Sequence, residues 1–414
     1  MIIRHTCSNG VRVVLENIPT VRSVAIGVWI GTGSRFENTK NNGISHFLEH
    51  MFFKGTKTRT AREIAESFDS IGGQVNAFTS KEYTCYYAKV LDTHAPYALE
   101  VLADMFFNST FEENELLKEK NVVLEEIKMY EDTPDDIVHD MLSRASFQNH
   151  ELGYPILGTE ETLNSFTGNT LRDYMNTHYV PEEVVVSIAG NIDESFIQKV
   201  EEWFGDYKSS NPFAKTEIHS PVFHPSKLTR KKETEQAHLC LGYPGLSLKD
   251  KRSYSLIILN NIFGSSMSSR LFQEVREQRG LAYSVFSYHS AFVDNGIFTI
   301  YGGTAPQQLD ELYDTIKNIV EDLNENGITD KELKNSKEQI KGNLMLSLES
   351  TNSRMSRNGK HELILGYHRS LDDMVESIDK VTKEQVNELI QSIFTESCSA
   401  SLVSPQGELP KGLQ

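Results

Sequence analysis

The chain repeats one pattern at an interval of about 217 residues, and this repeat limits the possible folds more than any other feature. The stretch FEENELLKEKNVVLEEI at 111–127 resembles ITDKELKNSKEQIKGNL at 328–344. A helix-then-strand pattern follows in each half, at 170–190 and at 382–404. Low identity with a conserved order is the mark of a diverged duplication. The sequence therefore predicts two homologous α+β domains.

A linker is predicted between the two halves. The segment at 208–227, KSSNPFAKTEIHSPVFHPSK, has three prolines and no clear periodicity. We therefore predict an N-terminal domain at 1–208, a linker at 209–226 and a C-terminal domain at 227–414. The alternative is that two unrelated α+β domains have similar element order by chance.

Composition and charge exclude several classes of protein. The net charge is −17 at pH 7, whereas a nucleic-acid-binding protein needs a basic surface. No run of 18 apolar residues is present, so no membrane-spanning helix and no membrane partner are expected. The start, MIIRHTCSNGVRVVLEN, reads as two strands joined by a turn rather than as a signal or transit segment.

The cysteines indicate a reducing compartment. They are scattered and form no close pair, so neither a disulfide framework nor a thiolate metal site is expected, and the cytoplasm is the expected location. The four positions are Cys7, Cys85, Cys240 and Cys398.

A polar stripe interrupts an apolar helical segment, GISHFLEHMFFKGT at 43–56. Asn42 as N-cap and Gly55 after the last turn predict a helix over 43–53. On this helix His46 and His50 lie one turn apart. Burying such groups without partners costs several kcal/mol, so the stripe requires a strong partner.

The stripe has the donor types of a zinc site. Two imidazoles one helical turn apart can bind one Zn²⁺, and Glu49 beside them can accept a proton from water. The pattern H-x-x-E-H is the inverted form of the H-E-x-x-H zinc motif. The alternative is a polar patch on an ordinary amphipathic helix. The apolar residues around the stripe argue against this alternative; they are Ile44, Phe47, Leu48, Met51 and Phe52.

A third ligand is expected from a second helix, predicted over residues 112–131 and ended by Pro134. Its glutamates Glu115, Glu119 and Glu126 fall on one stripe. Taken alone, this pattern is that of a solvated acidic helix. The histidine motif makes a metal-ligating role the alternative interpretation.

At this point the sequence resembles the pitrilysin-type inverzincin zinc metallopeptidases. The best resemblance is to the short branch, similar to the mitochondrial processing peptidase β subunit and its bacterial counterparts. HFLEHMFFKGT followed downstream by Glu126 carries the likeness. Further segments agree in order and spacing, namely GTGSRFE, GGQVNAFTSKEYTCYY, EKNVVLEEIKMYEDTPDD, GTEETL and SSRLFQEVREQRGLAYSV.

The resemblance implies both a fold and an activity. It implies two homologous domains, each a mainly antiparallel sheet packed with helices, which together form half of a clam-shell chamber. It also implies a zinc endopeptidase that hydrolyses peptides or unfolded segments, with one Zn²⁺ per chain, acting as a homodimer. A non-catalytic scaffold subunit of the same fold is the opposing hypothesis, and a hydrolase of non-peptide substrates is a third.

The resemblance also implies roles for individual residues. His46, His50 and Glu126 would bind zinc, and Glu49 would be the general base. Glu119 would support catalysis without being a main ligand. The implied substrate-binding residues are an edge-strand segment, Asn76, Ala77, Phe78 and Thr79, and two residues of the second half, Arg276 and Tyr283.

Each substrate-binding residue also has an ordinary interpretation. Without the family, Asn76 is a turn residue, Arg276 a solvated helix charge and Tyr283 a strand aromatic. The repeat interval places Phe263 opposite His46 and Asn343 opposite Glu126. The second half is therefore expected to lack zinc ligands.

Overall fold

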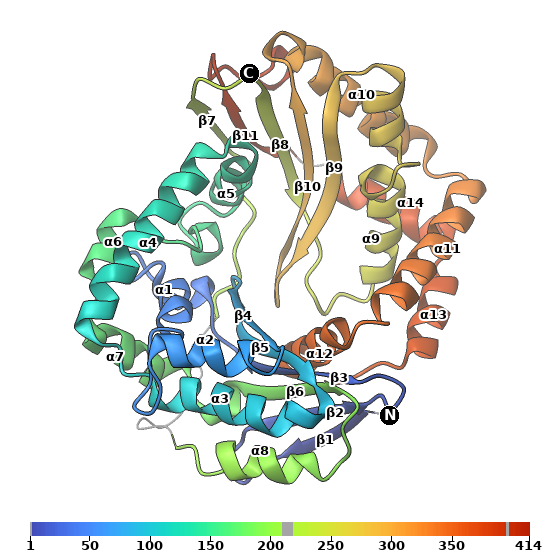
Figure 1. Ribbon diagram of the computed structural model, residues 1–414. Coiled ribbons are helices and arrows are strands. Elements are labelled where there is room, and N and C mark those ends of the chain that lie inside the picture. The colour runs from blue at the N-terminus through green and yellow to red at the C-terminus, as the bar shows by residue number, and fades with distance from the viewer. Residues whose placement is uncertain (1, 209–217, 395–396) are drawn as a thin grey trace. The chain divides into compact units, whose positions relative to one another are not determined.

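A computed structural model describes residues 2–208, 218–394 and 397–414. The chain divides into two compact units (Figure 1). The first unit comprises Met1–Lys128, Tyr154–Ile218 and Leu346–His368. The second comprises Met129–Gly153, His219–Met345 and Arg369–Gln414.

The first unit is built on a six-stranded sheet of order β1-β2-β6-β3-β5-β4. All neighbouring strands are antiparallel except β2 and β6, which are parallel. Alternate residues of the strands enter the cores on the two faces of the sheet. The strands are β1 (Ile2–Thr6), β2 (Arg12–Asn17), β3 (Ser23–Ile30), β4 (Gln74–Thr79), β5 (Thr84–Leu91) and β6 (Val184–Gly190).

Helices cover both faces of this sheet. The larger core lies on one face, where residues such as Val24 and Ile26 pack against the helices. On the other face Trp29 packs against Met355, and its indole nitrogen donates to the Met355 sulfur over 3.4 Å. The helices of the unit are α1 (Ile44–Met51), α2 (Ala61–Asp69), α3 (Ala95–Asn108), α6 (Glu160–Ser165), α7 (Gly168–His178), α8 (Phe196–Phe204) and α12 (Thr351–Lys360). Helix α4 (Glu113–Asp132) begins in this unit and ends in the second.

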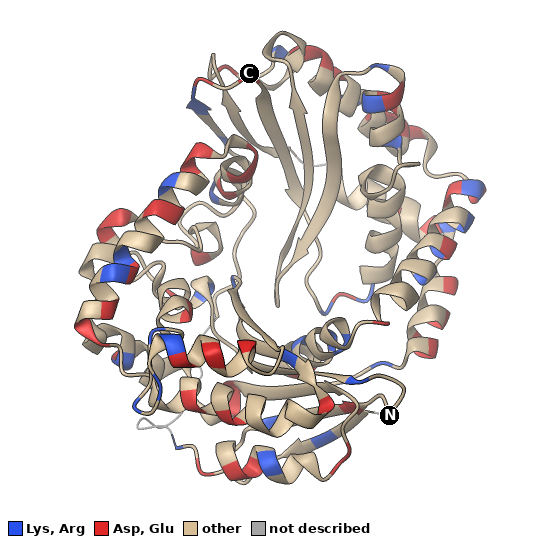
Figure 2. Ribbon diagram, in the orientation of Figure 1, with Lys and Arg blue, Asp and Glu red and all other residues tan. Residues whose placement is uncertain are grey.

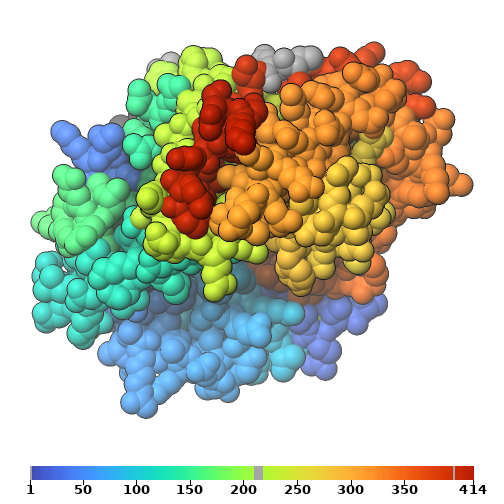
Figure 3. Space-filling model, turned by 90° about the horizontal axis from the view of Figure 1, so that it is seen from above, coloured from blue at the N-terminus to red at the C-terminus, as the bar shows by residue number. Residues whose placement is uncertain are grey.

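The second unit is built on a five-stranded sheet of order β7-β11-β8-β10-β9. Its strands are β7 (Lys227–Lys231), β8 (Ala237–Pro244), β9 (Ala282–Ala291), β10 (Gly296–Thr304) and β11 (Ser399–Ser404). Its helices are α5 (Pro134–Phe147), α9 (Ser253–Asn260) with the short helix η5 (Asn261–Ser265), η6 (Phe272–Gln278), α10 (Leu309–Asn326), α11 (Asp330–Ser347), α13 (Leu371–Asp379) and α14 (Lys383–Ile393). The C-terminal residues, red in Figure 3, lie on the surface of this unit, where the Tyr313 hydroxyl donates to the carbonyl of Gly412.

The two sheets share one topology. The order β2-β6-β3-β5-β4 in the first unit corresponds to β7-β11-β8-β10-β9 in the second. In both sheets only the first pair of this series is parallel, and the remaining pairs are antiparallel. Two mainly antiparallel sheets of the same order confirm the predicted pair of homologous α+β domains.

One helix of each half belongs to the compact unit built by the other half, which departs from the predicted domains at 1–208 and 227–414. Helix α12 packs on β3 and β6, and α5 packs on β8 and β11. The physical reason is burial, because each sheet has a second apolar face that needs a cover. Leu142 of α5 packs against Ile297, as Met355 packs against Trp29. Most of the predicted linker, residues 209–217, lies outside the described residues.

Two expectations from composition concern described residues. No helix in the described ranges is long and apolar enough to cross a bilayer. All four cysteines are free thiols, and Cys7, Cys85 and Cys240 are buried.

Candidate metal centre

The helix that carries the histidines begins at an unusual cap. Its N-cap is Gly43, with φ of 92°, and no side chain of the N-cap residue contributes. The predicted N-cap, Asn42, is wrong, because the buried carboxylate of Glu37 takes that role. Glu37 accepts the backbone N–H of Gly43 over 2.7 Å and that of Ser45 over 2.9 Å. The Asn42 side chain instead donates to Glu37 over 2.9 Å.

Three side chains converge between α1 and α4. Nε2 of His46 lies 3.7 Å from one carboxylate oxygen of Glu126, and Nε2 of His50 lies 3.4 Å from the other. One ligand atom from each of the three residues lies within 4.8 Å of the other two. The predicted one-turn spacing on α1 and the stripe on α4 are both present. This is a cluster that could hold a metal ion.

Glu119 holds one imidazole in place. Its carboxylate lies 2.8 Å from Nδ1 of His50 and 2.7 Å from the ammonium of Lys54. Burial favours the neutral form of Glu119, but the hydrogen bonds with His50 and Lys54 outweigh it and lower its pKa. A carboxylate on Nδ1 leaves Nε2 directed at Glu126, which is the arrangement that metal-binding histidines adopt. Glu119 thus contacts the ring atom of His50 that lies away from Glu126, and it is not one of the three clustered ligand residues.

The two imidazoles have opposite pKa shifts. Burial, followed by the charge of His50, lowers the pKa of His46 to about 4. Burial also opposes the charged form of His50, but hydrogen bonds with Glu119 and Glu126 outweigh it and raise the pKa of His50 to about 9. The carboxylates of Glu119 and Glu126 thus favour the positively charged form of His50.

The cluster fits a zinc ion by its donor set. Two imidazole nitrogens and one carboxylate oxygen leave a fourth position open, as in catalytic zinc sites. Nδ1 of His46 is buried and has no hydrogen-bond partner among the described residues. The Nε2 atoms of both histidines face the carboxylate of Glu126, so no ligand has to turn around to bind a cation.

Glu49 stands beside the cluster on the same helix. The hydroxyl of Thr79 donates to a carboxylate oxygen of Glu49 over 2.5 Å. Burial raises the pKa of Glu49, although the hydrogen bond from Thr79 opposes the shift. A carboxyl group with a raised pKa accepts a proton more readily than an ordinary carboxylate does.

The predicted substrate strand is an edge strand. β4 is the last strand of its sheet and pairs only with β5 among the described strands. Along it, Ala77 packs toward the larger core, while the ring of Phe78 lies 5.6 Å from that of Trp29 on the other face. The side chain of Asn76 accepts the N–H of Ala77 over 2.8 Å. Thr79, whose hydroxyl donates to Glu49, is the last residue of this edge strand.

Arg276 and Tyr283 meet within the second unit. Arg276 lies on η6, and Tyr283 is near the start of β9 with 77% of its surface exposed. The Arg276 guanidinium lies 4.5 Å from the centre of the Tyr283 ring and 4.7 Å from that of Phe272. Such cation–π contact holds both side chains in a defined arrangement at the surface.

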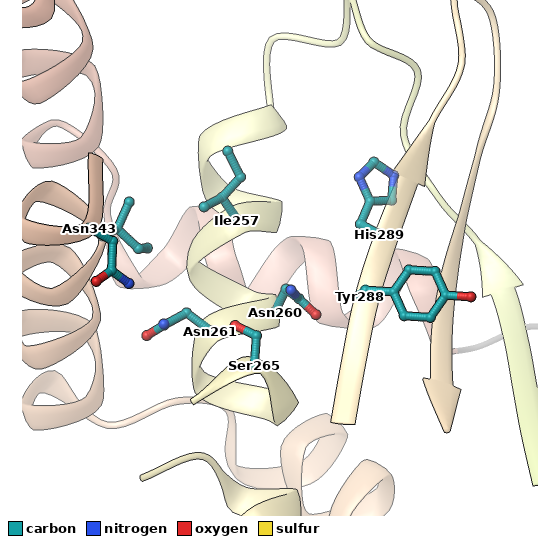
Figure 4. A pocket seen from close by; sticks show the side chains of 8 residues that line it. Ile257, Asn260, Asn261, Ser265, Tyr288, His289 and Asn343 are labelled. Atoms are coloured by element: carbon teal, nitrogen blue, oxygen red, sulfur yellow. The ribbon is translucent and has the colours of Figure 1, made fainter. Parts of the chain in front are cut away.

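The second unit has no zinc-like cluster among its described residues. Phe263, opposite His46 by the repeat interval, is buried, with its ring 5.8 Å from that of Phe298. Asn343, opposite Glu126, lines a pocket of about 390 Å³ between α9, α11 and β9 (Figure 4). The pocket lining is Ile257, Asn260, Asn261, Ser265, Tyr288, His289, Ile340 and Asn343.

Comparisons with known proteins agree with this architecture. Residues 12–160 match the family described as "Insulinase (Peptidase family M16)", and residues 165–340 match "Peptidase M16 inactive domain". Two solved structures superpose on this chain, each with a TM-score of 0.92. The first covers 98% of this chain and the second 99%, and the match spans 99% of each solved chain. They are a protease from Helicobacter pylori, 22% identical, and a peptidase M16 inactive domain from Pseudomonas fluorescens, 19% identical.

Curated relatives extend the likeness to the whole chain. An uncharacterised zinc protease of Bacillus subtilis, YmxG, is 67% identical over 99% of this chain and 100% of its own. An uncharacterised zinc protease of Streptomyces coelicolor is 41% identical over 97% of this chain and 89% of its own. The chain therefore belongs to the insulinase family of peptidases, M16, and is a zinc metalloprotease of the pitrilysin type.

Proposed function

We propose that the chain is a zinc endopeptidase that hydrolyses peptides or unfolded segments in the manner of processing peptidases. His46, His50 and Glu126 hold one zinc ion, and Glu49 is the general base. The observation that carries this proposal is the convergence of the three ligand side chains within 4.8 Å, with Glu49 on the same helix.

Zinc, when bound, polarises the scissile carbonyl and lowers the pKa of water. Glu49 accepts the proton of the attacking water and then delivers it to the leaving amine. Its raised pKa favours the protonated form that the second transfer needs. Glu119 keeps His50 in the tautomer that presents Nε2, through the 2.8 Å contact at Nδ1.

The edge strand β4 positions the peptide. An extended substrate adds to a free edge by main-chain hydrogen bonds, which makes few demands on its sequence. Asn76 to Thr79 provide that edge, and the Thr79 hydroxyl ties it to Glu49 over 2.5 Å. A peptide bond aligned on β4 would thus be in register with the general base.

Arg276 and Tyr283 bind the same substrate from the second half of the chain. Their stacked arrangement presents a cation and a phenol together, both able to donate hydrogen bonds to peptide carbonyls. These residues act on substrate binding and closure and have no part in holding the metal.

We further propose a homodimer in which two copies enclose the substrate in a chamber. Acidic residues are spread over helices of both units (Figure 2), and each chain carries a net charge of −17. An electronegative chamber would favour basic peptides by long-range attraction. Sedimentation should show two chains of 46.9 kDa per particle. A monomer that remains fully active at nanomolar concentration contradicts this part of the proposal.

We also propose that the enzyme works in the reducing cytoplasm. All four cysteines are free thiols, and three of them are buried. Oxidising compartments favour paired cysteines in secreted domains.

Metal analysis combined with a mixed peptide library tests the proposal. The wild-type chain should hold zinc and cut the library at internal peptide bonds, as read by mass spectrometry. Glu126→Gln should lose the metal at this cluster and the cleavage. Glu125→Gln is the matched control, because Glu125 is the neighbouring residue but is exposed and pairs with Lys128. Zinc without cleavage would favour the scaffold-subunit hypothesis instead.

A further inference from the structure

A second group of metal-binding side chains lies where the N-terminal strand meets α8. His5 is on β1, and Cys7 directly follows the last residue of that strand. Glu201 comes from α8, far away in the sequence. One ligand atom from each of the three residues lies within 4.8 Å of the other two.

The backbone around this group is held firmly. The N–H of Cys7 donates to the carbonyl of Val11 over 2.8 Å, and the carbonyl of Cys7 accepts the N–H of Gly10 over 3.0 Å. The Asn9 side chain donates to the carbonyl of Phe204 over 2.7 Å and so fastens the turn to the end of α8. The backbone that carries Cys7 is therefore held against the end of α8 before any ligand arrives.

The helix places Glu201 at the edge of its buried face. Val200, its neighbour, is fully buried, and Phe204 packs into the same core as Cys7. From this edge the Glu201 carboxylate reaches β1, where it lies 2.9 Å from Nε2 of His5. Cys7 lies near this pair and is buried, with 3% of the residue exposed.

The distances suit a tetrahedral ion after small side-chain movements. Ligand atoms at about 2.0–2.3 Å from zinc lie roughly 3.3–3.8 Å from one another. The His5–Glu201 contact would open slightly and the sulfur would approach within its present limit of 4.8 Å. The His5 and Glu201 side chains are 35% and 45% exposed, so both the movement and the entry of an ion are possible from solvent.

We propose that His5, Cys7 and Glu201 form a second metal site for a borderline transition-metal cation such as Zn²⁺ or Co²⁺. Imidazole, thiolate and carboxylate together select such ions over Mg²⁺ and Ca²⁺, which prefer oxygen ligands alone. The site shares no ligand with the His46–His50–Glu126 cluster. Its three protein donors leave a fourth position for water, so the ion exchanges with solvent more readily than in a four-ligand structural site.

Metal binding displaces one proton from the thiol. The S–H bond of Cys7 breaks, its proton goes to solvent and the sulfur binds the cation as thiolate. Burial, followed by the negative charge of Glu201, raises the pKa of Cys7 to about 11, so the thiol stays protonated while no cation is present. The consequence for the fold is a cross-link between the edge strand β1 and α8.

The ordinary alternative is a surface ion pair above a buried cysteine. An exposed His–Glu pair contributes little to stability, and a buried cysteine packs as a small apolar residue. Under this interpretation the group binds no metal, which a direct measurement can decide.

Cobalt titration of the metal-free full-length chain tests the proposal. A thiolate on Co²⁺ gives an intense near-ultraviolet charge-transfer band, which the histidine–carboxylate cluster cannot give because it has no sulfur. We expect this band in the wild type, and we expect it to disappear in Cys7→Ser while peptide cleavage and one equivalent of bound cobalt remain. Cys398→Ser is the matched control and should keep the band.

Two further variants distinguish the loss of a metal ligand from a folding defect. His5→Ala and Glu201→Gln change partly exposed side chains and leave the core intact. Each should weaken the cobalt affinity read from the band by roughly 10- to 100-fold or more, since losing even an outer partner of a metal ligand has that effect. No band in the wild type, or a band that persists in Cys7→Ser, overturns the proposal. Neither result bears on the proposed peptidase, which cleavage by Cys7→Ser reports separately.

Discussion

The carboxylate of Glu119 lies 2.8 Å from Nδ1 of His50, although the two residues belong to different helices. The contact holds the ring by Nδ1 and leaves Nε2 facing Glu126, 3.4 Å away. The same carboxylate is held by Lys54 from the end of α1. Metal affinity should therefore depend on a residue that is not itself a ligand.

Glu119→Ala should lower zinc affinity by roughly 10- to 100-fold, because His50 loses the partner that orients it. Competition with a chelator measures the change. Glu115→Gln is the control on the same helix, since Glu115 contacts the exposed Lys118 instead. Equal zinc affinity in the wild type and Glu119→Ala would show that the contact does not position His50.

The cover that α12 provides for the first sheet should be sensitive to one added methyl group. A Cβ at Gly359 would lie 2.3 Å from the indole nitrogen of Trp29. Gly359→Ala should destabilise the protein by about 1–3 kcal/mol through overpacking. Gly342→Ala on α11, where a Cβ would meet no atom within 4 Å, should instead stabilise it by about 0.4–1 kcal/mol. Denaturant unfolding compares the two, and a neutral Gly359→Ala would contradict the packing.

Acid should weaken the attachment of residues 346–368 to β1. Glu362 is buried and accepts two hydrogen bonds from Arg4, each 2.7 Å long. Burial favours the neutral carboxyl, but hydrogen bonds with His368 and Arg4 outweigh it and lower the pKa of Glu362 to about 2. A lowered carboxyl pKa stabilises the fold fully above its ordinary value of 4.5, and the contribution is lost as the pH falls toward 2.

Glu362→Gln should therefore lower the midpoint of thermal unfolding by several degrees at pH 7. The difference from the wild type should shrink below about pH 4.5. Glu66→Gln is the control, because Glu66 forms an exposed pair with Arg62 and such pairs contribute little. If the difference in unfolding midpoint between the variant and the wild type does not change with pH, the charge of Glu362 does not cause it.

Arg276→Gln and Tyr283→Phe should each lower kcat/KM without changing zinc content. The Arg276 guanidinium stacks on the Tyr283 ring at 4.5 Å, so the double variant should lose less than the sum of the two single effects. Arg279→Gln, a nearby charge change, should have little effect. Unaltered kcat/KM in both single variants would show that the pair takes no part in substrate binding.

The local patterns indicated part of the candidate cluster. Helical periodicity puts His46 and His50 one turn apart, but it does not distinguish Glu126 from the other glutamates of its stripe, and only the resemblance named Glu126. Glu37 was missed because capping rules examine the residue at the helix start, whereas this carboxylate reaches Gly43 and Ser45 from a preceding turn. The signal in the sequence was a glutamate at the end of GTGSRFE, a segment that follows the apolar stretch SVAIGVWI.

Relationships between distant segments could not be predicted from local patterns. Nothing near α5 or α12 indicates which sheet each helix will cover, because both sheets have two apolar faces. In the same way, the spacing of the cysteines argued against a thiolate metal site, since no two of them form a close pair. Its proximity to Glu201 exists only after β1 and α8 have packed together.

The most direct test of the central claim is the zinc content and turnover of Glu49→Gln. The amide removes the proton acceptor but no ligand, and it can still accept the hydrogen bond from Thr79. We expect zinc content equal to that of the wild type and kcat on an unfolded peptide lower by at least about 100-fold, the lower range for loss of a general base. Near-normal kcat with zinc retained would contradict the assignment of Glu49, and loss of zinc would contradict the assignment of the ligands.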